Sequence, residues 1–319
     1  VNRYRKAKEQ HQKLIPSIRK DNILKRRTPE RLIAGLIAAS ILAKCGCELR
    51  GVPGFFRIDG VWCFNLEPGM LIPTRNAVGQ IVALQVRRDK PSDWNDYCKR
   101  TGQNKEFLRY MTISAKGLPD GVTTDISQAH FPLGNDSLDD PETAVCITEG
   151  PLKADAAVEL KGNRKMFFIA LHGTSNTKTL PAIFAWLKGK GVETVFNVFD
   201  MDKVTNVNVA KAGKRVRAIA AGCGIKLAEK CWDAEYAQQK LSELNAICCE
   251  HGIFVPTTFN VFTDLANVSQ ELAKRNIRHS RVKNADGLEE KHYWSDKTKG
   301  IDDYLLSIRT ATGGEGASA

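Results

Sequence analysis

The segment Ala144-Val-Cys-Ile-Thr-Glu149-Gly150-Pro-Leu-Lys-Ala-Asp155-Ala-Ala-Val-Glu-Leu160 decides the fold of this chain. It begins as a short apolar, β-branched run, typical of a buried parallel strand, and continues after Glu149 as sequence typical of a helix. A second segment, Val195-Phe-Asn-Val-Phe-Asp200-Met-Asp202, is again an apolar run that ends in carboxylates. The two segments predict βα units of a parallel α/β sheet, with acids where the strands end.

These carboxylates are candidates for one shared site. Asp200 and Asp202 are two residues apart, so on extended backbone their side chains point the same way. Ligands of open parallel sheets bind beyond the carboxyl ends of the strands, so we expect Glu149, Asp200 and Asp202 to share a cleft. Three unpaired acids there would repel one another unless a hard cation such as Mg²⁺ lay between them. The alternative is that the acids only end their strands at a solvated rim.

Upstream, the chain has the pattern of a small, mostly antiparallel β unit. Residues 75–80 are typical of a hairpin turn between two of its strands. Short strands bounded by turn residues are expected at residues 55–58, 61–64, 69–72, 81–87 and 108–113.

Arginines on these strands are candidates for binding nucleic acid. Alternation along residues 81–87 puts Gln85 and Arg87 on one face. Guanidinium groups match phosphate oxygens and aromatic rings stack on bases, which suits a template strand or a nucleoside triphosphate. Arginines on exposed edge strands are also common without any ligand. The residues expected to line a cleft are Arg75, Arg87, Arg88, Arg109 and Tyr110.

Composition narrows the class of protein. The chain has 319 residues, a net charge of +11 and a pI near 9.2, which predicts two globular units and a polyanionic partner. Charge alone does not separate nucleic acid from an anionic membrane, and solubility is the other explanation. No apolar run is long enough to span a bilayer and no secretory pattern is present, so we expect a cytoplasmic protein without a membrane partner. Nine scattered cysteines without zinc-ribbon spacing predict reduced thiols rather than a zinc site.

The sequence predicts four parts. Residues 1–50 form a basic helical arm, whose first 30 residues hold ten Lys or Arg against three acids. Residues 51–142 form the β-rich basic unit, and residues 143–310 form an α/β domain with an insertion at about 233–290 of unknown purpose. Residues 311–319 are rich in Gly, Ser and Ala and are expected to be a disordered tail. The chain opens with Val1 rather than Met, as a piece excised from a longer protein would.

The order of three motifs resembles the Toprim domain, which bacterial primases, type IA and II topoisomerases and some nucleases share. The motifs are Glu149-Gly150 after one strand, the turn at Gly173 after the next, and Asp200-x-Asp202 after a third. The resemblance implies a mostly parallel α/β sheet flanked by helices.

Flanking segments make the likeness more specific. Residues 69–88 and 108–114 are similar to the basic subdomain that precedes Toprim in bacterial replicative primases, and Lys-Gly-Ile-Asp-Asp-Tyr-Leu at residues 299–305 resembles the segment that ends the primase Toprim sheet. The chain is most like primase-like Toprim proteins of plasmids, phages and integrative elements, over roughly residues 50–225 and 290–308.

This resemblance implies roles for the acidic residues. Asp200 and Asp202 would hold Mg²⁺ or Mn²⁺, Asp302 or Asp303 would contribute to the same or a second ion, and Glu149 would act as general base or as a further ligand. Residues 174–176, which follow the Gly173 turn, are expected to cap the next helix and leave amide donors aimed at an anion.

Several features depart from the primase pattern or remain open. Replicative primases carry an acid four residues after the Glu, where this chain has Lys153, which either pairs with Glu149 or meets a phosphate. They also carry a zinc-binding domain that nothing here supplies. Residues 173–179 superficially suggest a P-loop, but the second glycine is missing and Lys178 comes one position too early, which excludes a Walker A ATPase. His172 is a candidate ligand or proton carrier, although such a histidine is more often a structural donor.

The implied activity is a primase-type nucleotidyltransferase, a DNA-directed RNA polymerase that makes short oligonucleotides on single-stranded DNA in the replication of a mobile element. Its partners would be single-stranded DNA and nucleoside triphosphates, with a replicative helicase as a further candidate. A Toprim nuclease with the same metals and a non-catalytic DNA-binding replication module are the alternatives. A topoisomerase is disfavoured because nothing suggests its separate tyrosine-bearing domain.

Overall fold

The computed structural model divides the chain into two compact units, residues 1–74 with 81–126 and residues 75–80 with 127–319. No helix among the described residues is both long and apolar enough to cross a membrane. The structure describes residues 29–65, 68–89, 109–124, 128–204, 207–230, 232, 242, 246, 248–250, 252, 281–283, 289–291 and 299–313.

The first unit joins a helix to small antiparallel sheets. Helix α3 (Pro29–Lys44) packs against the hairpin of β1 (Phe55–Ile58) and β2 (Val61–Phe64). A two-residue turn with positive φ at Asp59 and Gly60 joins these strands, as a tight hairpin requires. A Cβ on Gly35 would lie 2.2 Å from the Phe64 carbonyl oxygen, so only glycine permits this approach of α3 to β2.

A three-stranded sheet completes the first unit. Its strands are β3 (Gly69–Arg75), β4 (Ile81–Arg88) and β5 (Tyr110–Thr112), in the order β3-β4-β5. Five strands were predicted in this region and all five are present, although β3 continues past the predicted end and β5 is shorter.

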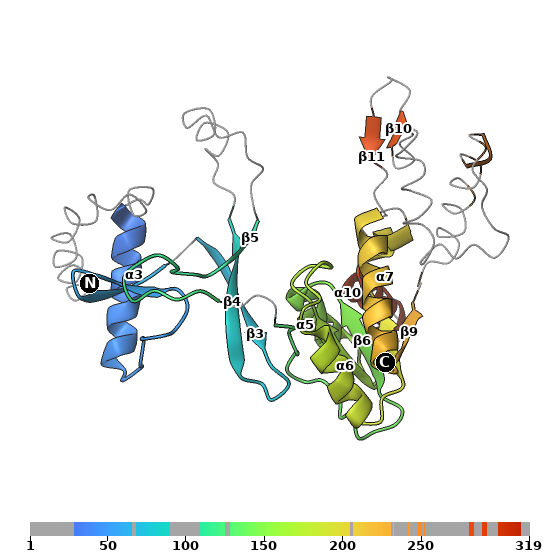
Figure 1. Cartoon of the computed structure of the whole chain (residues 1–319), viewed down its shortest axis with the longest axis horizontal. Coiled ribbons are helices and arrows are strands. Elements are labelled where there is room, and N and C mark those ends of the chain that lie inside the picture. The colour runs from blue at the N-terminus through green and yellow to red at the C-terminus, as the bar shows by residue number, and fades with distance from the viewer. Residues whose placement is uncertain are drawn as a thin grey trace. The chain divides into compact units, whose positions relative to one another are not determined.

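The second unit is built on a four-stranded parallel sheet. Its strands are β6 (Ala144–Thr148), β7 (Met166–Ala170), β8 (Thr194–Asn197) and β9 (Lys226–Glu229), in the order β7-β6-β8-β9. The intervening helices are α5 (Pro151–Leu160), α6 (Leu180–Gly189) and α7 (Val207–Gly222), and α10 (Ile301–Gly313) follows later in the chain (Figure 1). The predicted α/β class is confirmed.

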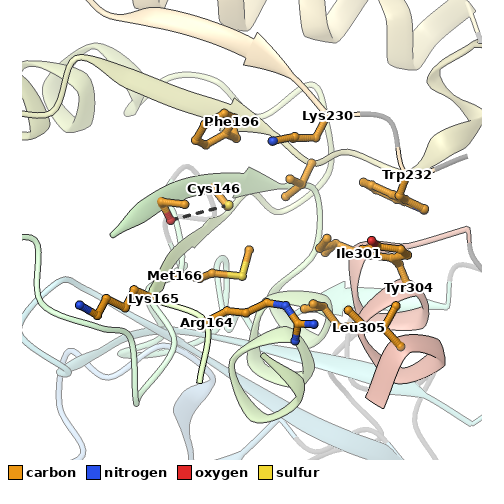
Figure 2. Close-up of a pocket in the computed structure, with 13 residues that line it drawn as sticks. Cys146, Arg164, Lys165, Met166, Phe196, Lys230, Trp232, Ile301, Tyr304 and Leu305 are labelled. Carbon is orange, nitrogen blue, oxygen red and sulfur yellow. Dashed lines mark hydrogen bonds between the residues drawn. The ribbon is translucent and has the colours of Figure 1, made fainter. Parts of the chain in front are cut away.

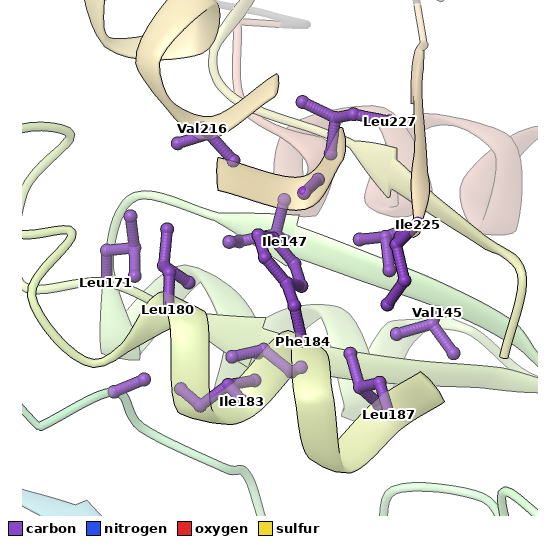
Figure 3. Close-up of a cluster of buried hydrophobic side chains, with 14 of the residues drawn as sticks. Val145, Ile147, Leu171, Leu180, Ile183, Phe184, Leu187, Val216, Ile225 and Leu227 are labelled. Atoms are coloured by element: carbon purple, nitrogen blue, oxygen red, sulfur yellow. The ribbon is translucent and has the colours of Figure 1, made fainter. Parts of the chain in front are cut away.

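Side-chain alternation along the strands separates two hydrophobic layers. Ile147 and its equivalents on the neighbouring strands pack against α6 and α7, where Phe184 and Val216 contribute to the same cluster (Figure 3). Cys146 faces the other way, toward apolar side chains of α5 and α10. The sheet is therefore covered on both faces, which explains why its strands are apolar throughout.

The unit boundary differs from the predicted one at residue 142. Residues 128–142 group with the second unit because they bond to its edge strand: His130 forms an isolated bridge to Ala170, and the Asn135 side chain bonds the backbone of Phe168 at 2.8 and 2.9 Å. The turn at residues 75–80 also groups there, since the Phe131 N–H donates to the Arg75 carbonyl at 2.9 Å.

Three further predictions concern the backbone at Asp202, the C-terminal tail and the insertion at 233–290. Asp202 is not on extended backbone, because it lies in the short 3₁₀ helix η2 (Met201–Val204), so the spacing argument for Asp200 and Asp202 was wrong. Helix α10 runs to Gly313, so the predicted disordered tail does not begin at residue 311. Most of the insertion at 233–290 lies outside the described residues. In the part that is described, β10 (Arg281–Lys283) pairs with β11 (Glu289–Lys291).

Candidate functional site

The sheet has one topological switch point, between β6 and β8. From β6 the chain crosses to β7 on one side, and from β7 it returns to β8 on the other side. In sheets of this kind the crevice at the carboxyl ends of the two central strands is the usual ligand site. Glu149 directly follows β6 and Asp200 follows β8, so both acids flank this point.

The two acids are in direct contact. The Asp200 backbone N–H donates to Oε2 of Glu149 at 3.0 Å, and the Asp200 side chain is almost fully buried. The Gly173 N–H donates to the Glu149 backbone carbonyl at 2.9 Å, which holds the end of β6 against the turn after β7. The predicted convergence of Glu149 and Asp200 at one sheet edge is therefore present.

A lysine lies between the two carboxylates. Nζ of Lys153, on the first turn of α5, donates to Oε1 of Glu149 at 2.9 Å and to Oδ1 of Asp200. A second cation, Nζ of Lys299, lies 3.5 Å from Oδ2 of Asp200. Of the two outcomes considered for Lys153, pairing with Glu149 is the one observed, and it extends to Asp200.

Burial and charge move the pKa values of the two acids in opposite directions. Burial first, and then the nearby Asp200 carboxylate, raise the pKa of Glu149 to about 7. Burial acts to raise the pKa of Asp200 too, but Lys153, the hydrogen bond with Glu149 and then Lys299 outweigh it and hold that pKa below its usual value. Burial opposes the charged form of Lys153, but the two carboxylates raise its pKa above that of an ordinary lysine. At neutral pH Asp200 is ionised and Glu149 is poised to exchange a proton.

Helix α10 contributes two further acids with different environments. Oδ2 of Asp303 accepts the Gly300 N–H at 2.9 Å and so caps the start of its own helix. Oδ1 of Asp302 is buried and has no hydrogen-bond partner among the residues that the structure describes. Burial and then Asp303 raise the pKa of Asp302, with a smaller contribution from Asp200, so Asp302 lies within electrostatic reach of the pair. The geometry favours Asp302 over Asp303 as a site residue.

The turn at Gly173, which was predicted to bind a nucleotide, is tied by its backbone to the end of β6. Gly173 has φ +88°, a conformation that favours glycine, and its N–H is already bonded to Glu149. The expected cap at residues 174–176 is wrong, because the N-cap residue of α6 is Thr179.

Burial and then His130 lower the pKa of His172 to about 4, which keeps this histidine neutral. For Asp202 the structure gives the backbone position in η2 only.

The predicted basic residues do not line one cleft. Arg87 is paired directly across the sheet with Tyr110, and Arg88 donates its N–H to the Arg109 carbonyl at 2.7 Å. Residues paired in this way share a face, and neighbours along a strand point to opposite faces. Arg87 and Tyr110 therefore lie on one face, and Arg88 and Arg109 on the other. Arg75 lies at the hairpin turn, the opposite end of β4 from Arg87.

Sequence reasoning missed a buried polar link beside the site. His130 is fully buried, accepts the Arg75 N–H at Nδ1 (3.1 Å) and contacts Oδ1 of Asp155 through Nε2 (3.0 Å). Asp155 lies on α5, two residues after Lys153. No signal in the sequence joins a loop histidine to a helix acid 25 positions later. The role of Lys299 was missed as well, although it stands in the motif that pointed to Asp302 and Asp303.

Divalent metals match this site in donor type. Glu149, Asp200 and Asp302 supply the carboxylate oxygens that Mg²⁺ and Mn²⁺ prefer, and Oδ1 of Asp302 is buried without a hydrogen-bond partner among the described residues. In the part of the chain that the structure describes, however, no group of three or more His, Cys, Asp or Glu side chains is arranged to hold a metal. In this structure Lys153 pairs with the oxygens of Glu149 and Asp200 that would face a cation.

A separate cavity is lined by residues of the sheet and of α10, and none of the predicted site residues lines it. It has a volume of about 540 Å³. Figure 2 shows Arg164 and Lys230 at its edges, and the rings of Trp232 and Tyr304 stack with centroids 5.9 Å apart. Its remaining lining is mostly apolar: Ala144, Cys146, Lys165, Met166, Phe196, Val198, Ile301, Leu305 and Ile308.

Comparison with known proteins gives a distant structural likeness to a primase. No protein-family model matches the chain, and no curated protein matches it. Among solved structures it is similar to the crystal structure of the Aquifex aeolicus primase (zinc binding and RNA polymerase domains), with 13% sequence identity and a TM-score of 0.38. The match covers 76% of this chain and 47% of that chain, so this chain spans about half the length of the primase chain.

Proposed function

We propose that this chain is a primase-like Toprim nucleotidyltransferase that uses Mg²⁺ or Mn²⁺ and acts on single-stranded DNA in the replication of a mobile element. Its main support is the meeting of Glu149 and Asp200 at the switch point of a parallel sheet. Burying two carboxylates together at that edge costs folding free energy unless a cation neutralises them or one of them holds a proton. The order of the sequence motifs supports the choice of the Toprim class.

In this proposal the acids divide into two roles. Asp200 and Asp302, with Asp202, hold the metal, which when bound would neutralise the charge on the phosphoryl group in transfer. Glu149, whose pKa of about 7 suits proton exchange at neutral pH, accepts the proton from the attacking 3′-hydroxyl. Asp303 keeps the first turn of α10 in place by capping it, and so orients Asp302.

The first unit would bind the template strand through the face that carries Arg87 and Tyr110. The half-buried Arg87 offers a guanidinium to phosphate oxygens, and the exposed ring of Tyr110 offers a stacking surface to a base. Arg88 and Arg109 lie on the opposite face, where they would add to the general attraction for DNA but not to the same contact.

Incorporation of labelled ribonucleotides on a single-stranded DNA template tests the proposal. With Mg²⁺ or Mn²⁺ present, the parent chain should make short oligonucleotides, and Asp200→Asn should make none. Absence of any product from stoichiometric parent protein, over a range of templates, would reject synthesis. Time-dependent cleavage of labelled DNA in the same reactions would instead identify the nuclease alternative, which needs the same acids.

The Lys153 bridge favours a second candidate, a DNA-binding replication module without catalysis. The Lys153 ammonium group already pairs with both carboxylates, and while Glu149 holds its proton the cluster carries no excess negative charge that would require a metal. If Asp200→Asn bound single-stranded DNA and supported replication of its element as well as the parent chain does, this second function would replace the first.

A further inference from the structure

We propose that the Lys153 ammonium group is the resident cation of the Glu149 and Asp200 carboxylates, and that a divalent metal enters only by displacing it. The identity of the incoming cation rests on the proposed function. The exchange itself is inferred from the hydrogen bonds and ion pairs that the oxygens of the two carboxylates already make. It makes Lys153 the residue that sets the metal affinity of the site.

All four carboxylate oxygens of the pair already have a partner. Oε1 of Glu149 and Oδ1 of Asp200 both face Nζ of Lys153. Oε2 of Glu149 accepts the backbone N–H of Asp200, and Oδ2 of Asp200 lies 3.5 Å from Nζ of Lys299. A metal held by Asp200 would have to take the Oδ1 that Lys153 holds, and a metal that bridged the two acids would take Oε1 of Glu149 as well. Two cations cannot share that position because their repulsion in a buried site is large.

The three side chains differ in how easily they can move. The side chain of Asp200 is 6% exposed and that of Glu149 16%, whereas that of Lys153 is 28% exposed. The two acids are fixed by the ends of β6 and β8 and by the hydrogen bond between them. Lysine has a flexible four-carbon stem and a compact charge that water solvates well. Lys153 is therefore the member of the cluster that can leave without unfolding a strand end.

A displaced Lys153 would stay near the site. Its backbone is fixed on the first turn of α5, where Gly150 is the N-cap residue and Pro151 the first helical residue. From this anchor the ammonium group still reaches the edge of the sheet, and the start of a helix is a favourable place for a phosphate. Lys153 would then exchange a carboxylate partner for a substrate phosphate, so that cation entry and phosphate binding are linked.

The exchange predicts weak metal binding in the parent chain and tighter binding without the lysine. A competitor that occupies the site lowers the apparent affinity by the fraction of molecules in which the site is open. Replacing Lys153 by methionine keeps the length of the side chain and removes the competing charge. Lys161→Met is the matched control, because Lys161 ends the same helix and its Nζ forms a comparable ion pair with Asp136 at 2.5 Å, away from the acids.

Calorimetric titration of the whole chain with MnCl₂ and MgCl₂ measures the effect directly. Lys153→Met should bind the metal about tenfold or more tightly than the parent chain, and Lys161→Met should match the parent. Equal or weaker binding by Lys153→Met would overturn the exchange. If neither protein binds metal, both the exchange and the proposed chemistry are wrong. If Lys153→Met binds more tightly but no nucleotide is incorporated, only the proposed function fails.

A second measurement uses the parent chain and does not depend on the variant folding. Acetylation of lysines by an amine-reactive reagent, located by peptide mass spectrometry, reports how often each ammonium group is released. Saturating Mn²⁺ should increase the labelling of Lys153 several-fold relative to Lys161, because the metal frees one and not the other. Unchanged or reduced labelling of Lys153 with metal bound would overturn the exchange.

Discussion

The backbone N–H of Asp200 donates to the Glu149 carboxylate at 3.0 Å, across the junction of β6 and β8. This bond joins two strand ends that are 51 positions apart in the chain. It brings a second buried carboxylate, that of Asp200 itself, against Glu149, and thereby contributes to the raised pKa of Glu149. The same contact is thus structural and electrostatic, so changes at Glu149 are expected to alter the pH dependence of stability.

The first prediction concerns the pH dependence of unfolding in the metal-free chain. The pKa of Glu149 is raised to about 7, so between its unfolded value of 4.5 and 7 the folded state binds the extra proton. The contribution of Glu149 to stability therefore falls as pH rises through this window, by an amount on the order of 3 kcal/mol. Glu149→Gln should remove that slope, as measured by urea unfolding at several pH values in EDTA.

The titration of His172 changes stability with pH in the opposite direction, so its effect must be distinguished from that of Glu149. Its pKa is lowered to about 4 by burial and His130, so its contribution to stability is complete above its unfolded pKa of 6.5 and is lost as pH falls. Both proteins contain His172, so the difference between the parent and Glu149→Gln isolates the carboxylate. A difference that does not change between pH 4.5 and 7 would contradict the first prediction.

A second prediction concerns the charge of Asp200. Asp200→Asn keeps the size of the side chain but leaves Lys153 and Lys299 facing a neutral group in a largely buried site. We expect a loss of about 1–3 kcal/mol in the free energy of unfolding at pH 7, measured by urea denaturation. The double variant with Lys153→Met should lose less than the sum of the two single changes, because the shared ion pair is removed once. Strict additivity would show that the bridge contributes nothing.

The third prediction concerns the two faces of the β4–β5 pair. Arg87→Ala and Tyr110→Ala should each weaken binding to single-stranded DNA, the first by about 1–2 kcal/mol and with a shallower salt dependence, the second by about 1–3 kcal/mol. Fluorescence anisotropy with a labelled oligonucleotide at several salt concentrations measures both. Arg57→Ala is the control, because Arg57 in the same unit is already paired with Asp120 at 3.4 Å and lies over the Trp62 ring. An equal effect of the control would mean that binding depends only on net charge.

The elements of the fold could be predicted from the sequence where local pattern decides them. The apolar runs before Glu149 and Asp200 give β6 and β8, and the Asp59-Gly60 pair gives the hairpin turn, because strand burial and turn chemistry are local properties. The backbone of Asp202 could not be predicted in this way. After β8 the chain turns into η2 and buries Met201 completely, and that burial decides the direction of the backbone.

The site could be predicted only as far as the sheet edge fixes it. Parallel strands bring Glu149 and Asp200 to one edge, which a pattern of strand ends predicts. The bridge from Lys153 to Asp200 depends on the packing of α5 across that edge, and the Lys299 contact depends on a segment about 100 positions later in the chain. The division of Arg87 and Arg88 between two faces was available from the alternation of side chains, but the register with Tyr110 was not.

The last prediction concerns His130, which links the hairpin turn to α5. His130→Leu keeps much of the volume but leaves the Arg75 N–H and the Asp155 carboxylate without the bonds that the imidazole makes at 3.1 and 3.0 Å. A buried donor without a partner costs about 1–3 kcal/mol, so the free energy of unfolding should fall by at least that amount. His130→Gln can still offer both an acceptor and a donor and should lose less. Asp155→Asn keeps an oxygen acceptor for the imidazole N–H and should be nearly neutral. If His130→Gln were as unstable as His130→Leu, the shape of the imidazole ring, and not its two hydrogen bonds, would be what the site requires.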